Sequence, residues 1–155
     1  MIKKYMMPTF IALITGLILG RFVLNQYNFE GKIIPTISSS KYAYFIQQGV
    51  YSSKESMEDN VLSFPYYIYM VDNEKYYVYI GITFLEENME KIKGYYKDKG
   101  YTTYVKQINI NNDDFITVLE QYDILLKETS DKEVIGTVCS QVLNKYEELV
   151  LRSDN

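Results

Sequence analysis

Hydrophobic and polar positions divide the chain into four consecutive segments. Residues 1–24 are almost continuously apolar after a basic start, and residues 25–41 are a glycine-, proline- and serine-containing stretch typical of a linker. Residues 42–110 alternate between short runs of β-forming side chains and longer stretches with helical spacing. Residues 111–155 carry apolar side chains at helical spacing throughout. The pattern therefore predicts an N-terminal apolar segment, a linker, a mixed α+β domain and a helical extension.

The apolar segment is long enough to cross a membrane. The 20 residues 5–24 rise about 30 Å as a helix, which matches the hydrocarbon core of a bilayer. Their one charge, Arg21, lies near the far end, where a long side chain reaches the interface. A cleaved signal peptide is the alternative, but the segment lacks a small-x-small cleavage pattern. We expect an uncleaved, single-pass anchor, with Lys3 and Lys4 in the cytoplasm and the rest of the chain extracytoplasmic.

Residues 42–108 have the element order β-α-β-β-α-β. Strand-forming runs rich in Tyr, Val and Ile alternate with one short and one longer helical pattern, separated by turn residues. The expected strands cover residues 42–48, 66–71, 75–82 and 101–108, with helices over 53–63 and 85–100 and a turn at 72–74. This order predicts a ferredoxin-like sandwich, in which four antiparallel strands carry two helices on one face.

Three short motifs within this segment resemble those of one protein family. The first strand ends in Ile46-Gln47-Gln48-Gly49-Val50-Tyr51, and a serine-rich helix start follows it. The third strand reads Tyr76-Tyr77-Val78-Tyr79-Ile80-Gly81, and Gly100-Tyr101 precedes the last strand. In order and spacing the segment resembles a SPOR domain, the sporulation-related repeat of bacterial envelope proteins. The resemblance implies binding of denuded peptidoglycan glycan strands at division or spore septa, on the sheet face that the helices leave uncovered.

Strand alternation suggests which side chains would form that glycan-binding face. If Ile46, Val78 and Ile80 point toward the helices, the opposite face holds several aromatic and polar side chains. The resemblance places Gln47, Lys75 and Tyr77 at the family's contact positions, although Lys75 and Tyr77 stand in reversed order and Gln48 replaces an apolar residue. The full candidate set is Gln47, Lys75, Tyr77, Tyr79, Tyr67, Tyr69 and Tyr104. Tyrosine also suits any half-buried strand, so a purely structural role for these side chains is the alternative.

The extension 111–155 contains two amphipathic helical patterns and is acidic. It has four basic and ten acidic side chains, a net charge of −6. Its apolar stripes must pack somewhere: against each other, on a protein partner, or on the tyrosine face of the sheet. Packing on the sheet would close the glycan platform and favour a protein–protein interaction or assembly factor with little glycan binding.

Composition excludes several chemistries. The chain has no histidine and only one cysteine, Cys139, so it cannot form a Ser-His-Asp triad, a Cys-His pair, an intrachain disulfide or a cysteine-based zinc site. Residues 41–155 hold 12 basic and 19 acidic side chains, which argues against nucleic acid as a partner and against an RNA-recognition-like sheet. We therefore expect a non-enzymatic envelope protein without cofactor or metal, which binds glycan or, alternatively, another protein.

Overall fold

The computed structural model describes residues 40–152, and their order of elements confirms the prediction. The elements are β1 (Lys41–Tyr51), α2 (Lys54–Val61), β2 (Ile68–Asp72), β3 (Lys75–Thr83), α3 (Glu86–Asp98), β4 (Tyr104–Ile110), α4 (Asp113–Glu128), α5 (Lys132–Tyr146) and a π-helical turn η1 (Glu147–Leu151). Ser53 caps α2 by accepting a hydrogen bond from the Ser56 amide, and Pro65 lies between α2 and β2, where it interrupts neither.

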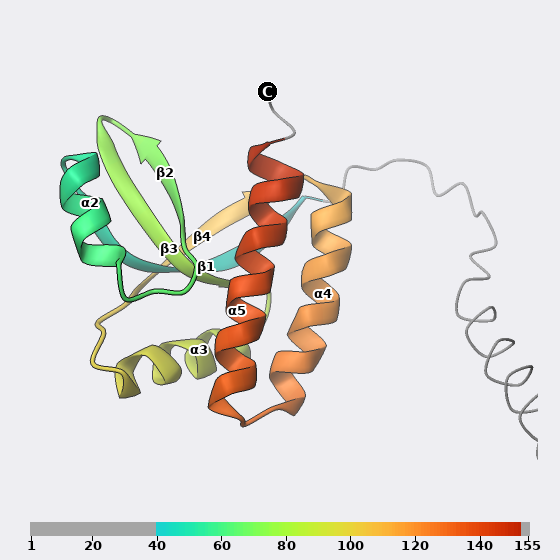
Figure 1. Ribbon diagram of the computed structural model, residues 1–155. Helices are drawn as coiled ribbons and strands as arrows, with labels where there is room; N and C mark the ends of the chain where they lie inside the picture. Colours follow the sequence, from blue (N-terminus) through green and yellow to red (C-terminus); the bar gives the residue numbers. More distant parts are fainter. Residues whose placement is uncertain (1–39, 153–155) are drawn as a thin grey trace, which may run out of the picture. The chain divides into compact units, whose positions relative to one another are not determined.

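The four strands form one antiparallel sheet in the order β2-β3-β1-β4 (Figure 1). This order follows from the split βαβ connection, in which β1 and β3 become the central strands. The two central strands are therefore covered on both sides by neighbouring strands, whereas β2 and β4 each leave one edge free. β3 is buried along most of its length, and its residues 78–83 are all buried.

The turn between β2 and β3 is one residue shorter than expected, and this reverses the faces of β2. Asn73 and Glu74 both have positive φ angles, of 48° and 61°, and Asp72 pairs directly with Lys75. A three-residue turn would have paired Tyr69 with Tyr77, whereas the two-residue turn pairs Tyr69 with Val78. Since a shift of one residue moves every side chain of a strand to the other face, the expected placement of Tyr69 beside Tyr77 is wrong.

An irregularity in β1 accounts for the polar residue in the Gln47-Gln48-Gly49 motif. Gln47 pairs with Tyr79 and Gly49 pairs with Val78, so Gln48 is an extra residue in the ladder. Its side-chain oxygen accepts a hydrogen bond of 2.7 Å from the Tyr51 hydroxyl. The Gln48 side chain is therefore hydrogen-bonded within β1, although the family motif has an apolar side chain at this position.

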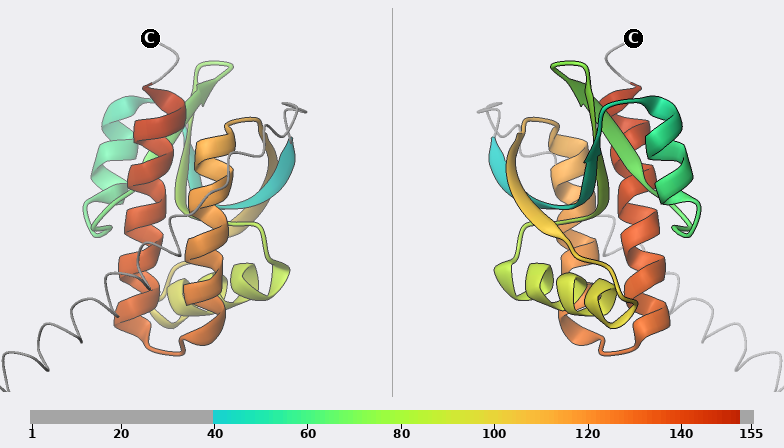
Figure 2. Two further views of the ribbon diagram at one scale, coloured as in Figure 1. Left: turned by 90° about the vertical axis from the view of Figure 1, so that its right-hand side faces the viewer. Right: turned by 90° about the vertical axis from the view of Figure 1, so that its left-hand side faces the viewer.

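The C-terminal helices pack on the sheet face that carries the predicted glycan-binding residues. This is one of the three alternatives that the sequence left for the apolar stripes of the extension. Figure 2 shows α4 and α5 side by side on one side of the strands and α2 on the other, whereas α3 lies below the sheet, next to the lower parts of α4 and α5. The Phe45 ring packs against the Tyr146 ring of α5, with centroids 5.3 Å apart, and Tyr146 packs against Phe115 of α4 at 5.0 Å. Sheet and helices thus share one hydrophobic core, and the extension is part of the same compact unit as the sandwich.

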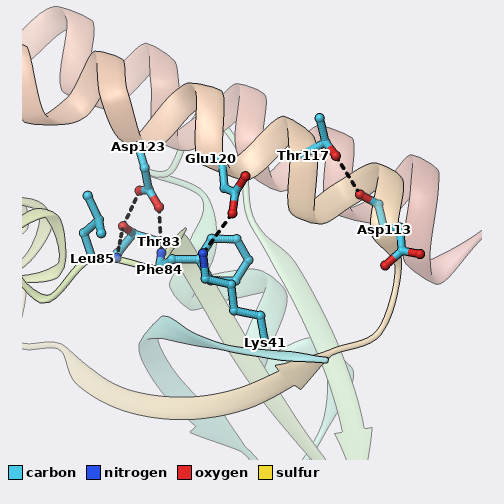
Figure 3. A network of polar contacts seen from close by, with 8 residues as sticks. All are labelled: Lys41, Thr83, Phe84, Leu85, Asp113, Thr117, Glu120 and Asp123. Atoms are coloured by element: carbon cyan, nitrogen blue, oxygen red, sulfur yellow. Dashed lines mark hydrogen bonds and ion pairs between the residues drawn. The ribbon is translucent and has the colours of Figure 1, made fainter. Parts of the chain in front are cut away.

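Polar contacts fix the helical hairpin at the end of the sheet. Asp123 of α4 accepts hydrogen bonds from the Thr83 hydroxyl and, at 2.8 Å, from the Phe84 amide, at the point where β3 leads into α3 (Figure 3). The Asn88 side chain donates to the Asp123 main-chain oxygen at 2.9 Å. Lys91 of α3 donates to carbonyl oxygens at the end of α4, including that of Thr129 at 2.8 Å. The Lys91 ammonium thereby provides partners for carbonyl oxygens in the last turn of α4, which have none within the helix.

The predicted membrane anchor, residues 1–24, and nearly all of the predicted linker lie outside the described residues. Within residues 40–152, none of the helices combines the length and the apolar character that a membrane crossing requires. The anchor and the orientation inferred from it therefore stay predictions.

Candidate functional site

One of the predicted glycan-contact residues, Tyr79, is buried under the C-terminal helices. Tyr79 is 1% exposed and Phe45 is fully buried, and their rings meet edge to face with centroids 5.3 Å apart. Burial, with smaller contributions from Tyr77 and Asp72, raises the pKa of the Tyr79 phenol above its ordinary value. A side chain enclosed in this way cannot stack on a ligand unless α5 leaves the sheet.

The same face remains open beyond Tyr79, and there the structure brings four side chains together. We call Gln47, Tyr77, Tyr104 and Lys106 the open patch. Gln47 pairs with Tyr104 across β1 and β4, and the Lys106 ammonium lies 4.9 Å from the centroid of the Tyr77 ring, across β1. Tyr104 is 62% exposed, whereas Gln47 and Tyr77 are half-buried. The open patch offers an aromatic ring, an amide and a cation, which can contact the apolar face and polar edges of a sugar.

The remaining predicted residues lie apart from the open patch. Lys75 is exposed at the tip of the β2–β3 hairpin. Tyr69 lies on the opposite face of the sheet, where its ring is 5.8 Å from that of Tyr76. Tyr67 precedes β2 and lines a groove at the sheet edge. Three of the seven predicted residues (Gln47, Tyr77 and Tyr104) therefore share one exposed surface.

That groove runs along the free edge of β2. It has a volume of about 730 Å³. One side consists of residues 65–71, and the other is formed by the C-terminal turn through Glu147, Leu151 and Arg152. We call this feature the β2 groove. Its side chains are mainly apolar or aromatic, among them Tyr67, Ile68, Met70 and Leu151.

The charges beside the β2 groove are paired with groups of the chain itself. Arg152 forms an ion pair of 3.1 Å with Glu147, and the Tyr66 hydroxyl donates a hydrogen bond to the other Glu147 oxygen. Asn144 in turn donates to the Tyr66 hydroxyl at 3.2 Å. Desolvation and the neighbouring Glu147 carboxylate raise the pKa of the Tyr66 phenol. The groove therefore presents largely neutral chemistry to an incoming molecule.

Sequence reasoning did not find the β2 groove, because neither of its walls has a local signature. The predicted fold did contain one indication of the groove: its strand order places the second strand at an edge of the sheet, where a groove can form. The position of the opposite wall depends on how α5 docks, and no periodicity in residues 132–151 specifies that docking site.

Neither surface brings together the side chains of a metal centre. No group of three or more cysteine, aspartate or glutamate side chains within residues 40–152 is arranged to hold a metal ion. The chain has no match among protein-family models, curated proteins or solved structures. The SPOR resemblance therefore rests on the three motifs and on the order of elements.

Proposed function

We propose that this protein is a membrane-anchored envelope interaction factor, which uses a SPOR-like sheet closed by its own C-terminal helices to bind other proteins. The anchor is the apolar segment 5–24, and the folded unit 40–152 lies outside the cytoplasmic membrane. In this proposal the chain has no enzymatic role and takes no cofactor. Its function is to bring partners together at the site where it is anchored.

The observation that carries the proposal is the burial of Phe45 and Tyr79, with the Phe45 ring packed between the rings of Tyr79 and, on α5, Tyr146. Glycan binding in the resembled family requires an open sheet face, and here its centre is occupied by α5. Uncovering it would expose the apolar side chains of two elements to water, at about 25 cal/mol per Å² of apolar area. The surfaces that remain are the β2 groove and the open patch, and the groove is lined mainly by apolar and aromatic side chains, as protein-binding surfaces are.

Glycan binding by the open patch is a second candidate function. It is favoured by the presence of Gln47, Tyr77 and Tyr104 on one exposed surface, with Lys106 beside them. Stacking on an aromatic platform contributes about 1–3 kcal/mol per nucleic-acid base, and an unconjugated sugar ring should gain less. A single exposed tyrosine would give weak binding at most.

A sedimentation assay separates the two functions. The full chain in detergent is mixed with amidase-treated sacculi, and the bound fraction is compared for wild type, Gln47→Ala and Tyr104→Ala. We expect no retention of any of the three proteins. Retention of wild type that both substitutions abolish would favour the glycan function instead.

Site-specific photo-crosslinking in cells tests the protein-binding function directly. A photoreactive amino acid replaces Val71 in the β2 groove, Tyr104 in the open patch or Leu62, the C-cap residue of α2, which is 83% exposed. We expect a defined protein adduct, identified by mass spectrometry, from at least one of these surfaces. Absence of adducts from all three positions would contradict the proposed function.

A further inference from the structure

We infer that the β2 groove binds an extended segment of another protein, which pairs with β2 as a fifth strand of the sheet. The inference rests on the proposed function and gives it a site and a class of partner. The partner segment is a β-strand with uncharged, mainly apolar side chains at alternate positions.

The backbone of β2 supplies the first argument. In a two-residue hairpin the residues that flank the turn exchange both main-chain hydrogen bonds, so Asp72 with Lys75 is a hydrogen-bonded pair. Alternation then directs the amide and carbonyl groups of Met70 and Ile68 toward β3. The corresponding groups of Tyr69 and Val71 point outward, into the solvent beside the free edge. An unpaired row of this kind is a template for a further strand.

The shape of the groove favours a single segment over a second copy of the sheet. An incoming chain lies between β2 on one side and Glu147, Leu151 and Arg152 on the other. One extended backbone fits this arrangement. A second copy would bring a four-stranded sheet with helices on both faces, and its bulk would meet the wall formed by the C-terminal turn.

The side chains of the groove define what the partner presents. Ile68 and Met70 share the face on which Leu151 stands, so partner side chains on that face meet apolar surface. Because Glu147 is already engaged by Arg152 and Tyr66, a charged partner residue would find no free counter-charge there. The opposite face offers the Tyr69 ring, 39% exposed. A neutral segment with apolar side chains at alternate positions fits both faces.

The test uses a synthetic peptide of alternating valine and threonine, capped at both ends, added to the full chain in detergent. Two further peptides have the same side chains but carry N-methyl groups on alternate amides. One is methylated at the odd positions and the other at the even positions, so that only one of them blocks the amides that face β2. Protein variants are Val71→Pro, which removes an outward amide at an edge position that tolerates proline, and the matched control Val71→Thr. Binding is followed by isothermal titration and by amide chemical shifts.

We expect the unmethylated peptide to bind wild type and Val71→Thr with similar affinity and to protect the amides of Tyr69 and Val71. Val71→Pro should weaken binding at least tenfold, and one of the two N-methylated registers should do the same without any change in the protein. An unaltered thermal transition of Val71→Pro shows that the fold is intact. If Val71→Pro is unfolded, the methylated peptides decide alone.

Three outcomes of the peptide experiment would overturn the inference. They are absence of binding at millimolar peptide, equal binding of all peptides irrespective of methylation, and a wild-type dimer that Val71→Pro converts to monomer, since that dimer would make a second copy the occupant. Crosslinks from Tyr104 or Leu62 but not from Val71 would also overturn it, while leaving the proposed function in place.

Discussion

The two halves of one sheet face differ in what covers them. Around Phe45 and Tyr79 the face lies beneath α5 and is sealed by ring-to-ring contacts. Two residues along β1 from Phe45, at Gln47, the same face becomes open on the side of β4. Gln47 pairs with Tyr79 of β3, which is buried, and with Tyr104 of β4, which is 62% exposed. The same residue type therefore serves the core on β3 and the surface on β4.

This difference shows that strand alternation assigns a side chain to a face but not to solvent. Tyr77, Tyr79 and Tyr104 lie on the same face, as expected. Which of them is accessible is decided by the packing of α5, an element that begins only at Lys132. Aromatic strand residues thus indicate a binding platform only when every element able to pack on them has been placed.

Removal of the covering helices should have the largest effect. A chain that ends at residue 111 would expose Phe45, Tyr79 and Ile82 to water, so we expect loss of the cooperative unfolding transition, equivalent to the whole stability of about 5–15 kcal/mol. Circular dichroism during urea titration measures it. A soluble, cooperatively unfolding product would show instead that residues 42–110 fold without the extension.

The reactivity of the Cys139 thiol should differ strongly between the folded and the unfolded chain. Cys139 of α5 is 1% exposed, and burial raises the pKa of its thiol to about 12. Because labelling requires opening of the structure, we expect the rate with a thiol reagent to fall at least about a thousandfold on folding. Native labelling at the rate of the urea-unfolded chain would contradict a closed sheet face.

Paired substitutions compare the covered and open halves directly. Phe45→Ala removes a fully buried ring that contacts Tyr79 and Tyr146, and it should lower the free energy of unfolding by about 3–5 kcal/mol. Tyr104→Ala, on the exposed half, should change it by about 0.5 kcal/mol or less. Urea titrations of both variants give the two values, and equal costs would argue that the two halves are equally accessible.

A smaller effect than that of Phe45→Ala is expected as a pH dependence at the junction of α4 with β3. Burial raises the pKa of Asp123 above its usual 3.8, although hydrogen bonds from Thr83, Phe84 and Asn88 oppose the shift. A raised folded-state pKa stabilises the protein below the unfolded pKa, and this contribution is lost as the pH rises through the folded value. Asp123→Asn should therefore cost more at pH below 3.8 than at neutral pH, with a total of about 1–3 kcal/mol.

Urea titrations of wild type and Asp123→Asn across this pH range test that sign. The difference between the two proteins cancels the titration of other carboxyl groups to first order. A difference that grows toward neutral pH would mean that the charged form of Asp123 is the one that the fold favours.

Local patterns were sufficient to predict the elements of the sandwich. The runs of β-forming residues, the capping serine before α2 and the amphipathic period of α3 each follow from short-range preferences, and the element order then fixes the topology. The face of β2 was missed for a local reason as well, since the Asp72-Asn73-Glu74 stretch is compatible with a turn of either two or three residues.

The candidate site could be predicted only in part, because its limits are set by long-range packing. Gln47, Tyr77 and Tyr104 were identified through strand periodicity and the family resemblance. Tyr79 packs on Phe45, and Phe45 is in turn covered by Tyr146, which lies about 100 positions further along the chain. Apolar stripes on α4 and α5 indicate that the helices are buried against something, but they do not name the surface.

Ring-to-ring nuclear Overhauser effects in the full chain test the covered sheet face most directly. The centroids of Phe45 and Tyr146 are 5.3 Å apart, so cross-peaks between their ring protons are expected, together with cross-peaks from Phe45 to Tyr79. The covered sheet face would be contradicted if the Tyr146 cross-peaks were absent and a soluble relaxation agent broadened the ring signals of Tyr79 as strongly as those of Tyr104.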